Sequence, residues 1–187
     1  MRLCALFFAA LLAVSCSSSY KSMSADEKRE FLVELEAQTL ADLVEDQPDA
    51  QADLDNAIGH AIFSNSAAKV PFVGTGDGIG VVVNQETDER TYLKVTRFDV
   101  GGGLGVRSYR VIMIFFEEEA LNKLAGGKLE FGAGIEARAK EKDVGTGAGG
   151  IAGSRKKGYV LYQLSDSGVS ATFTVNMISY SVLDLEE

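Results

Sequence analysis

Few side chains in this sequence could carry out catalysis. The chain has one histidine, His60, which stands beside Gly59, Ala61 and Ile62 in an apolar stretch. A lone histidine in that setting is more often structural than catalytic, and the sequence offers no second histidine for a histidine-based metal cluster. The nucleophile pattern Gly-x-Ser-x-Gly is also absent. We therefore expect a protein that is not an enzyme and needs no cofactor or metal. A small hydrolase that depends on His60 is the less favoured alternative.

One glycine-rich segment matches the spacing of a dinucleotide-binding loop. Gly145, Gly147 and Gly150 fit the pattern G-x-G-x-x-G. In dinucleotide-binding proteins this pattern follows a strand and opens a helix. Here it follows the charged residues 140–143, and Gly153 interrupts the segment after it. We expect a flexible loop rather than a nucleotide site.

A basic cluster just after this segment is the candidate binding site of the sequence. Three adjacent cations stand between two glycines, and backbone amides of a glycine loop together with cations suit a phosphate group. Further cations before the loop could lie nearby. The candidate phosphate-binding residues are Arg155, Lys156, Lys157, Gly153, Gly158, Arg138, Lys140 and Lys142. The alternative is a solvated loop that keeps the domain soluble.

Residues 1–15 have the pattern of a secretory signal peptide. Arg2 precedes an uncharged apolar run at 3–14, shorter than the roughly 20 residues that a transmembrane helix needs. The run ends in small residues before Cys16, which resembles a lipobox, although Ala13 stands where leucine is typical. We expect Cys16 to carry the lipid anchor, with residues 16–23 as a tether. An ordinary signal peptide that leaves a free thiol is the alternative. Ser17, in place of Asp, is similar to the outer-membrane sorting pattern, so we expect a cell-envelope protein facing the periplasm.

Net charge and cysteine content limit the possible classes of function and the bonds that can stabilise the fold. The full chain has 18 basic and 27 acidic side chains, a net charge of −9; loss of Arg2 with the signal leaves −10. Nucleic-acid binding needs a basic footprint, so that class is excluded. Cys4 would leave with the signal and Cys16 would be acylated. The mature domain must then hold together without disulfides.

The pattern of apolar residues divides the chain into a helical and a strand-like part. Ser24 and Glu27 have capping-box spacing, and helical periodicity follows as far as Pro48. A second helix is expected over 54–63. After it we expect strands at 70–75, 79–83, 91–100, 108–116 and 128–140, a short helix at 117–124, and a hairpin of 159–164 and 169–182 around a turn at 165–168. These elements predict an α+β fold with N-terminal helices packed on a mostly antiparallel, glycine-rich sheet, sandwich-like or barrel-like, in one domain over 24–187.

An ordered set of segments resembles the SYLF domain, a lipid-binding family that also occurs in yeast actin-patch proteins. The segments are residues 56–63, 68–74, 76–81, 101–105, 111–116, 119–121 and 129–133, and the resemblance covers roughly 49–183. Exported bacterial members share the ending at 159–169. Three features differ from the family pattern: Ser64 follows Phe63, the chain has no Trp, and Gly103 stands where Ser is usual.

The resemblance implies that the protein binds phospholipid through anionic head groups, and the basic cluster around residues 153–158 would then be the lipid-binding site. Two function classes remain open. In the first, the chain is a non-enzymatic phospholipid-binding lipoprotein. In the second, it is an envelope lipoprotein that binds another protein, and the glycine-rich sheet is only a scaffold.

Overall fold

The structure, a computed structural model, describes residues 19–101, 103–128, 158–172 and 175–185. Its elements in chain order are η1 (Ser19–Ser22), α1 (Ala25–Asp46), α2 (Ala50–Asp55), β1 (Gly59–Val70), β2 (Phe72–Asn84), β3 (Arg90–Gly101), β4 (Gly103–Phe115), α3 (Glu118–Ala125), β5 (Tyr159–Thr172) and β6 (Val175–Val182). The six strands form one sheet in the order β5-β4-β1-β2-β3-β6, and all neighbours are antiparallel. The predicted α+β fold with an antiparallel sheet is confirmed.

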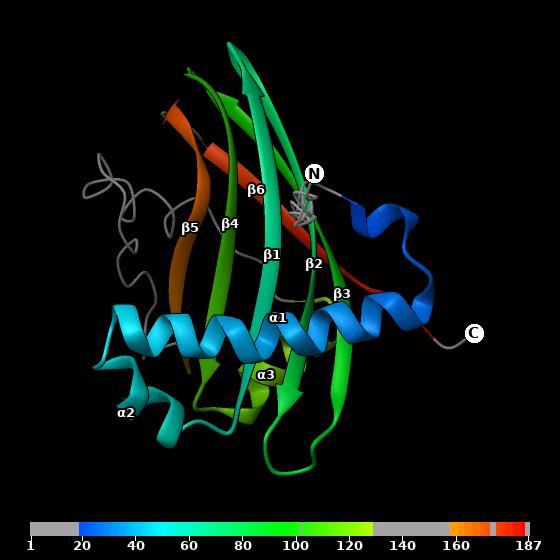
Figure 1. The fold of residues 1–187 in the computed structure, drawn as a ribbon, viewed down its shortest axis with the longest axis vertical. Helices are drawn as coiled ribbons and strands as arrows, with labels where there is room; N and C mark the ends of the chain where they lie inside the picture. Colours follow the sequence, from blue (N-terminus) through cyan, green and yellow to red (C-terminus); the bar gives the residue numbers. More distant parts are fainter. Residues whose placement is uncertain (1–18, 102, 129–157, 173–174, 186–187) are drawn as a thin grey trace, which may run out of the picture.

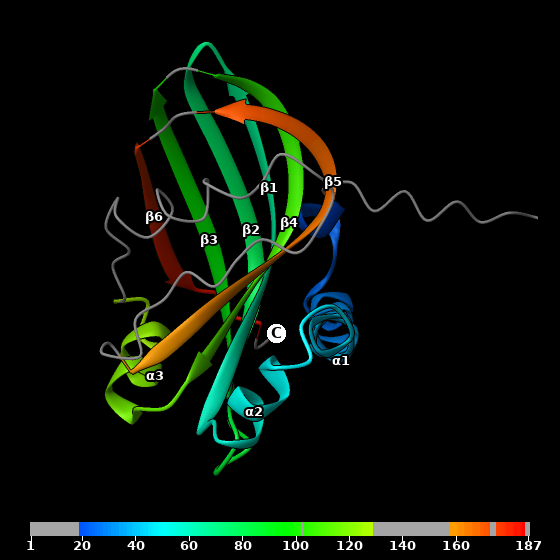
Figure 2. The same ribbon diagram turned by 90° about the vertical axis from the view of Figure 1, so that its left-hand side faces the viewer.

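The sheet is long and strongly curved. Figure 1 shows α1 lying across the strands on the outer face of the sheet, with the strands continuing well beyond it. Figure 2 shows that α1 lies on the convex side, whereas α3 lies on the concave side at one end. We call the end beyond α1, where the β1–β2 turn lies, the distal end. Since β1 has 12 residues, it extends for about 40 Å.

The first helix forms as its sequence indicates. Ser24 and Glu27 make both bonds of a capping box: the Ser24 hydroxyl accepts from the Glu27 amide at 3.3 Å, and Glu27 Oε2 accepts from the Ser24 amide at 2.7 Å. The helix ends at Asp46, two residues before Pro48. Leu32 and Leu43 point inward and are fully buried. Each such side chain contributes about 1.5–3 kcal/mol by burial.

Apolar side chains cover both faces of the sheet near the helices. The outer layer lies under α1 and α2 and contains Leu32, Leu43, Ala50, Ile62, Ile79, Val81, Val83, Ile112, Ile114, Val160, Tyr162 and Leu164. The inner layer lies against α3 and contains Ala61, Phe63, Val82, Leu93, Val95, Met113, Phe115, Ala120, Leu121, Leu124 and Tyr159. Both layers belong to the half of the sheet away from the distal end.

The second helix was predicted in the wrong place. The expected helix over 54–63 is instead the end of α2, at Asp55, followed by β1 from Gly59. In β1, Ile62 packs in the outer layer and Phe63 in the inner layer. A strand buried on both faces has no polar alternation, so its apolar run also fits helical spacing.

Two strand predictions were also wrong. The expected strands at 70–75 and 79–83 are one continuous strand, β2, and the expected turn at 165–168 lies inside β5. There Tyr109 pairs with Ser165 and Ser108 with Ser167, so Asp166 is the extra residue of a β-bulge. As a result β5 and β6 lie at opposite edges of the sheet rather than in one hairpin. The expected strand at 128–140 lies outside the described residues.

Candidate functional site

The outer face of the distal end exposes two adjoining rows of apolar side chains. In one row, strand pairing aligns Val106, Ala68, Thr75, Phe98 and Met177 across five strands. In the next row, Val70, Val73 and Val100 are aligned, with Leu104 on the neighbouring β4. We call the seven large apolar residues of this set the apolar rows: Val70, Val73, Phe98, Val100, Leu104, Val106 and Met177. Their exposed fractions run from 42% to 70%. A contiguous exposed apolar surface of this kind marks a contact with a membrane or another protein.

The turn between β1 and β2 adds an aromatic residue at the distal tip. Phe72 follows Pro71, has a φ of 81°, and is 72% exposed. A left-handed backbone is unfavourable for a bulky residue, by about 1–2 kcal/mol. Strained, exposed residues of this kind cluster at functional sites. Phe72 therefore extends the apolar surface to the tip of the hairpin.

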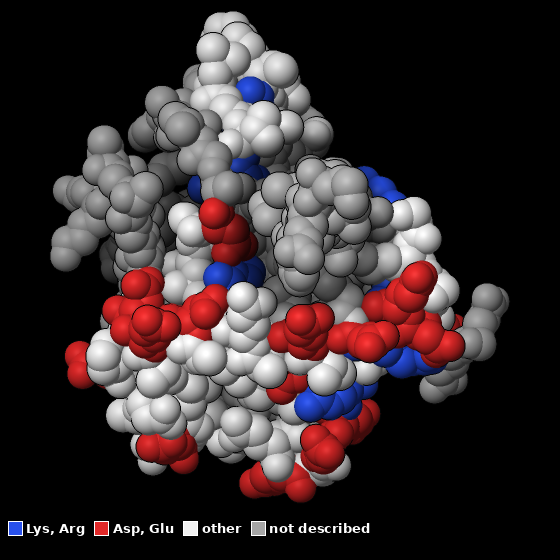
Figure 3. All heavy atoms as spheres, viewed as in Figure 1, with Lys and Arg blue, Asp and Glu red and all other residues white. Residues whose placement is uncertain are grey.

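Exposed acidic side chains gather over the helices rather than at the upper end of the molecule in Figure 3. Figure 3 shows Asp and Glu gathered over α1 and α2, whereas the visible surface at the upper end is mostly uncharged, with a few basic side chains. The overall negative charge is thus unevenly distributed. An anionic surface would meet the least repulsion at the distal end.

The N-terminal segment begins beside the apolar rows. Tyr20 of η1 donates a hydrogen bond of 2.6 Å to Asp77 Oδ2, and Lys21 Nζ lies 3.2 Å from the same carboxylate. Asp77 stands on the outer face of β2, two residues from Thr75 in the apolar row. Burial and the bond to Asp77 raise the pKa of Tyr20, so the phenol stays protonated and remains a donor. The first described element, η1, therefore lies close to the apolar rows.

The concave face at the distal end is polar. Along β3, Leu93 and Val95 face inward near α3, and the next two inward residues are Arg97 and Asp99. Arg97 Nε donates to Asp99 Oδ1 at 2.8 Å, and both side chains are buried. Arg97 Nη1 also lies 3.2 Å from the hydroxyl of Tyr109 on β4. The inward side of this strand therefore changes from apolar to charged partway along.

Glycines on β2 make room for these long side chains. Gly74, Gly76, Gly78 and Gly80 all face inward, between β1 and β3. A Cβ on any of the four would have its nearest neighbour, an atom of β1 or β3, at 2.2–3.1 Å. Arg97 of β3 and the hydroxyl of Tyr109 of β4 are hydrogen-bonded although β2 and β1 lie between their strands, so the two side chains together span these strands. A column of glycines permits this close approach.

The concave polar face also contains a buried lysine. Lys69 of β1 is 7% exposed, and its Nζ atom has no hydrogen-bond partner in the part of the chain that the structure describes. Pairing places Lys69 opposite Gly74, whose other neighbour is Asp99. On the other side, Arg107 of β4 lies with its guanidinium carbon 4.6 Å from the centre of the Tyr109 ring. The buried cation is the least satisfied polar group of this face.

The single histidine has a structural setting. His60 is 4% exposed, and its Nε2 atom lies 3.0 Å from Glu36 Oε1 on α1. Glu36 also accepts a bond from Arg90 at the start of β3. Burial alone would raise the pKa of Glu36, but the bonds from His60 and Arg90 outweigh it and hold that pKa below its ordinary value. The group joins α1 to two strands, so His60 has a structural role in the fold.

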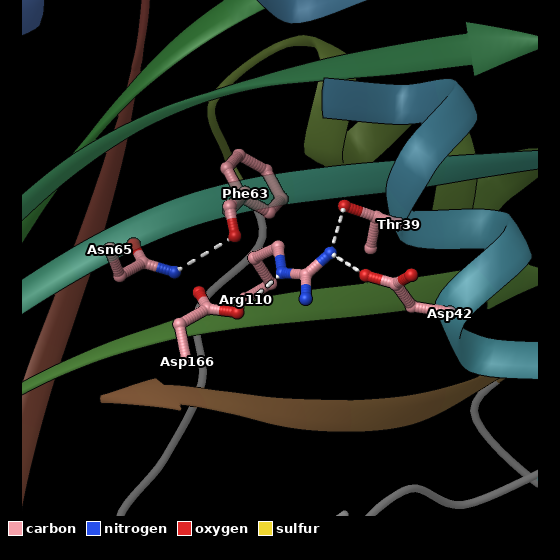
Figure 4. A network of polar contacts seen from close by, with 6 residues as sticks. All are labelled: Thr39, Asp42, Phe63, Asn65, Arg110 and Asp166. Atoms are coloured by element: carbon pink, nitrogen blue, oxygen red, sulfur yellow. Dashed lines mark hydrogen bonds and ion pairs between the residues drawn. The ribbon is translucent and has the colours of Figure 1, made fainter. Parts of the chain in front are cut away.

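A second polar group attaches α1 to strands β4 and β5. Arg110 of β4 donates to Thr39 at 3.1 Å and to Asp42 at 2.7 Å, both on α1. Its Nε atom donates to Asp166 of the bulge in β5 at 2.7 Å. Figure 4 shows the Arg110 guanidinium lying between the helix and this carboxylate. The polar groups under α1 thus hold the helix in place.

The residues proposed from sequence lie mostly outside the described chain. Arg138, Lys140, Lys142, Gly153, Arg155, Lys156, Lys157 and Cys16 fall in residues that the structure does not describe, so these predictions stand as predictions. Gly158 is described: its φ is 77°, and a Cβ there would lie 2.7 Å from Cβ of Glu117. Its carbonyl accepts from the Phe116 amide at 2.8 Å. Gly158 therefore has a structural reason to be glycine.

Sequence reasoning missed Lys69, Arg97, Arg107 and the apolar rows. A signal was present in β3, where Arg97 and Asp99 alternate with Phe98 and Val100. Alternation with period two predicts a strand but does not say which face is buried. In the described segments, no group of three or more His, Cys, Asp or Glu side chains could hold a metal ion. None of the described helices is both long and apolar enough to cross a bilayer.

Comparison with known proteins finds a partial similarity to a bacterial protein. No protein-family model matches the chain. The chain is similar to part of Beta cell expansion factor A from Aeromonas veronii, with 33% identity over 78 residues. That stretch is 42% of this chain and 29% of the relative, so the chain matches less than a third of the relative's length. The chain is thus a distant relative of a segment of this bacterial protein.

Proposed function

We propose that this chain is a non-enzymatic, phospholipid-binding lipoprotein of the bacterial cell envelope. A lipid on Cys16 anchors it, in the outer membrane and facing the periplasm, and the apolar rows contact the bilayer. The observation that carries the proposal is the exposure of seven large apolar side chains in two adjoining rows. A phospholipid bilayer offers an apolar interior to such a surface.

The energy available from this contact is appreciable. Complete burial of one such side chain stabilises by about 1.5–3 kcal/mol, and each member of the apolar rows is roughly half exposed. Burial of the remaining area then contributes about 1 kcal/mol per residue, or on the order of 5–7 kcal/mol for the set. The costs of association reduce this sum. The contact is therefore suited to hold a tethered domain against a membrane.

The short distance along the chain from Cys16 to η1 supports a membrane contact through the apolar rows. Two residues separate Cys16 from Ser19, and a chain of three steps reaches about 10 Å at most. Because η1 is bonded to Asp77 beside the apolar rows, acyl chains on Cys16 would enter a bilayer near them. The acidic surface over α1 and α2 would then face away from anionic lipid (Figure 3). The resemblance to the SYLF domain supports phospholipid as the ligand.

Vesicle flotation tests the proposal without the lipid anchor. The chain from Ser17 onward retains every described element, and it should float with neutral and anionic vesicles. A variant with Phe98→Ser, Val100→Ser and Val106→Ser should lose at least ten-fold in vesicle affinity, because about 1 kcal/mol is lost at each position. Val33→Ser is the control, because Val33 is 48% exposed on α1, away from the distal end.

The outcomes separate the two function classes. Flotation that survives high salt and is lost in the triple variant supports membrane contact through the apolar rows. A salt-sensitive part that is lost when Arg155, Lys156 and Lys157 become Ala would be due to the basic loop. If the wild-type chain floats under no condition, Cys16 is the only membrane contact. The apolar rows then fit a protein partner, and the proposal is wrong.

A further inference from the structure

The buried lysine on the concave face lacks the partner that a buried charge normally has. An ammonium group that is removed from water without a partner is costly, so buried charges in proteins are nearly always paired. Lys69 Nζ is buried and lacks a hydrogen-bond partner among the residues with described positions. No carboxylate lies within 4 Å of it in those segments, although Asp99 stands only two strands away. Asp99 is instead engaged by Arg97.

A second cation stands beside Lys69. On β4, Arg107 pairs with Ala67, which is two residues from Lys69 on β1. Such diagonal neighbours on one face of a sheet have Cα atoms about 7–8 Å apart, within reach of long side chains. The positions that pair with them are Ala67 on β1 and Gly105 on β4, so no large side chain of these two rows stands between the cations. A small anion between Lys69 and Arg107 could contact both.

The charge balance of this face suits a doubly charged anion. Its described charged side chains are the cations Lys69, Arg97 and Arg107 and the acid Asp99, which leaves a net charge of +2. A phosphate monoester carries close to two negative charges at neutral pH, whereas a carboxylate or phosphodiester carries one. Arginine offers a planar fork and lysine a point charge, a pairing that recurs in phosphate recognition.

We infer that the concave face holds a binding site for a terminal phosphate group, with Lys69 and Arg107 as its direct ligands. Arg97 is a positioning residue, because its pairing with Asp99 removes that carboxylate from Lys69. The phosphate comes either from a free phosphate monoester or from the head group of a lipid that ends in one. The site is on the opposite face of the sheet from the apolar rows, so it stands independently of the proposed membrane contact.

Thermal unfolding with inorganic phosphate tests the site in the chain from Ser17 onward, which retains all the described elements. Phosphate should raise the Tm in a saturable way, beyond sodium chloride of equal ionic strength, because a ligand that binds only the folded state stabilises it. The Lys69→Met variant should have a Tm equal to or above that of the wild type without phosphate, since an unpaired buried charge is gone. It should also lose the phosphate response. Lys94→Met, an exposed lysine on β3, should change neither property.

Further ligands identify the source of the phosphate, and a second variant keeps the test valid if the first does not fold. Glycerol 3-phosphate and short-chain phosphatidic acid, the latter below its micelle concentration, are compared with short-chain phosphatidylcholine. A Tm response to both phosphate monoesters supports a site for any terminal phosphate, and a response to phosphatidic acid alone supports a lipid ligand. Arg107→Gln, at a partly exposed position, should weaken phosphate binding at least ten-fold even if Lys69→Met does not fold.

The inference is overturned if no phosphate compound raises the Tm beyond the salt control. It is equally overturned if Lys69→Met and Arg107→Gln keep the wild-type response. Because these measurements contain no vesicles, they stay separate from flotation. A protein that floats on neutral vesicles but ignores phosphate would keep the proposed function and lose this site.

Discussion

Replacing Glu36 by Gln should destabilise the protein through the attachment of α1. Glu36 is buried, and its two carboxylate oxygens accept from His60 on β1 and Arg90 on β3. Gln keeps the shape but loses the charge, so Arg90 is left without its carboxylate. Removing one partner of a buried ion pair costs 3–5 kcal/mol as a rule. Since the Arg90 side chain is 31% exposed and water screens it, we expect about 2–3 kcal/mol here.

Calorimetry and urea denaturation measure this loss directly. For a domain of this size, the expected loss corresponds to a decrease in Tm of roughly 4–12 °C. Glu34→Gln, an exposed position on the same helix, is the matched control and should change the free energy of unfolding by less than about 0.5 kcal/mol. A decrease of less than about 1 kcal/mol for Glu36→Gln would refute the reasoning.

The pH dependence of the same pair of proteins gives a second test. The pKa of Glu36 in the folded protein lies below its ordinary value of 4.5. The carboxylate therefore contributes stability that is fully present above the unfolded-state pKa and is lost as the pH falls through the folded-state pKa. The difference in stability between wild type and Glu36→Gln should be largest above about pH 5 and should narrow below about pH 4.5. A difference that stays constant down to pH 3 would contradict this role.

Two further substitutions test the sheet and the second helix. Gly78→Ala places a Cβ 2.3 Å from the carbonyl oxygen of Ser64, so the free energy of unfolding measured in urea should fall by about 3 kcal/mol or more. The control is Gly126→Ala, whose Cβ would have its nearest neighbour at 3.3 Å and should be nearly neutral. A Gly78→Ala protein as stable as wild type would refute the close approach. Tyr162→Phe removes a 2.7 Å hydrogen bond to buried Asp53 on α2. The free energy of unfolding should fall by about 1–3 kcal/mol, and hydrogen exchange of the α2 amides should accelerate. Unchanged exchange would show that this bond does not hold the helix.

Local signals in the sequence were sufficient for the first helix. The capping box of Ser24 and Glu27 is formed within four residues, so it is visible without the rest of the fold. The short helix α3, expected at 117–124, is observed at Glu118–Ala125 for a similar reason, with Gly126 directly after it. Such local features need no information about partners.

Features that depend on distant partners could not be predicted. The apolar run that became β1 fits either a helix or a strand until both of its faces are known to be covered, by α1 and by α3. The turn-like residues 165–168 continue β5 because Asp166 bulges out and pairs with Arg110. In each case the deciding contact joins residues far apart in the chain.

The candidate site could not be predicted from sequence because the polar and apolar faces of the sheet exchange partway along the strands. On β3, the inward residues change from Val95 to Arg97 and the outward residues from Thr96 to Phe98, without a change in alternation. A sequence pattern shows that the two sets differ but not that the charged set faces inward. Lys69 is a similar case, because it lies on the same inward face and is buried there.

The membrane contact of the apolar rows can be measured with a single introduced fluorophore. The chain has no Trp, so Phe98→Trp and Val33→Trp each give one emission signal from an exposed position. Vesicles whose acyl chains carry bromine quench only an indole that enters the bilayer. Our account predicts strong quenching and a blue shift for Phe98→Trp and neither for Val33→Trp. Flotation of the Phe98→Trp protein without quenching of its indole would contradict the account.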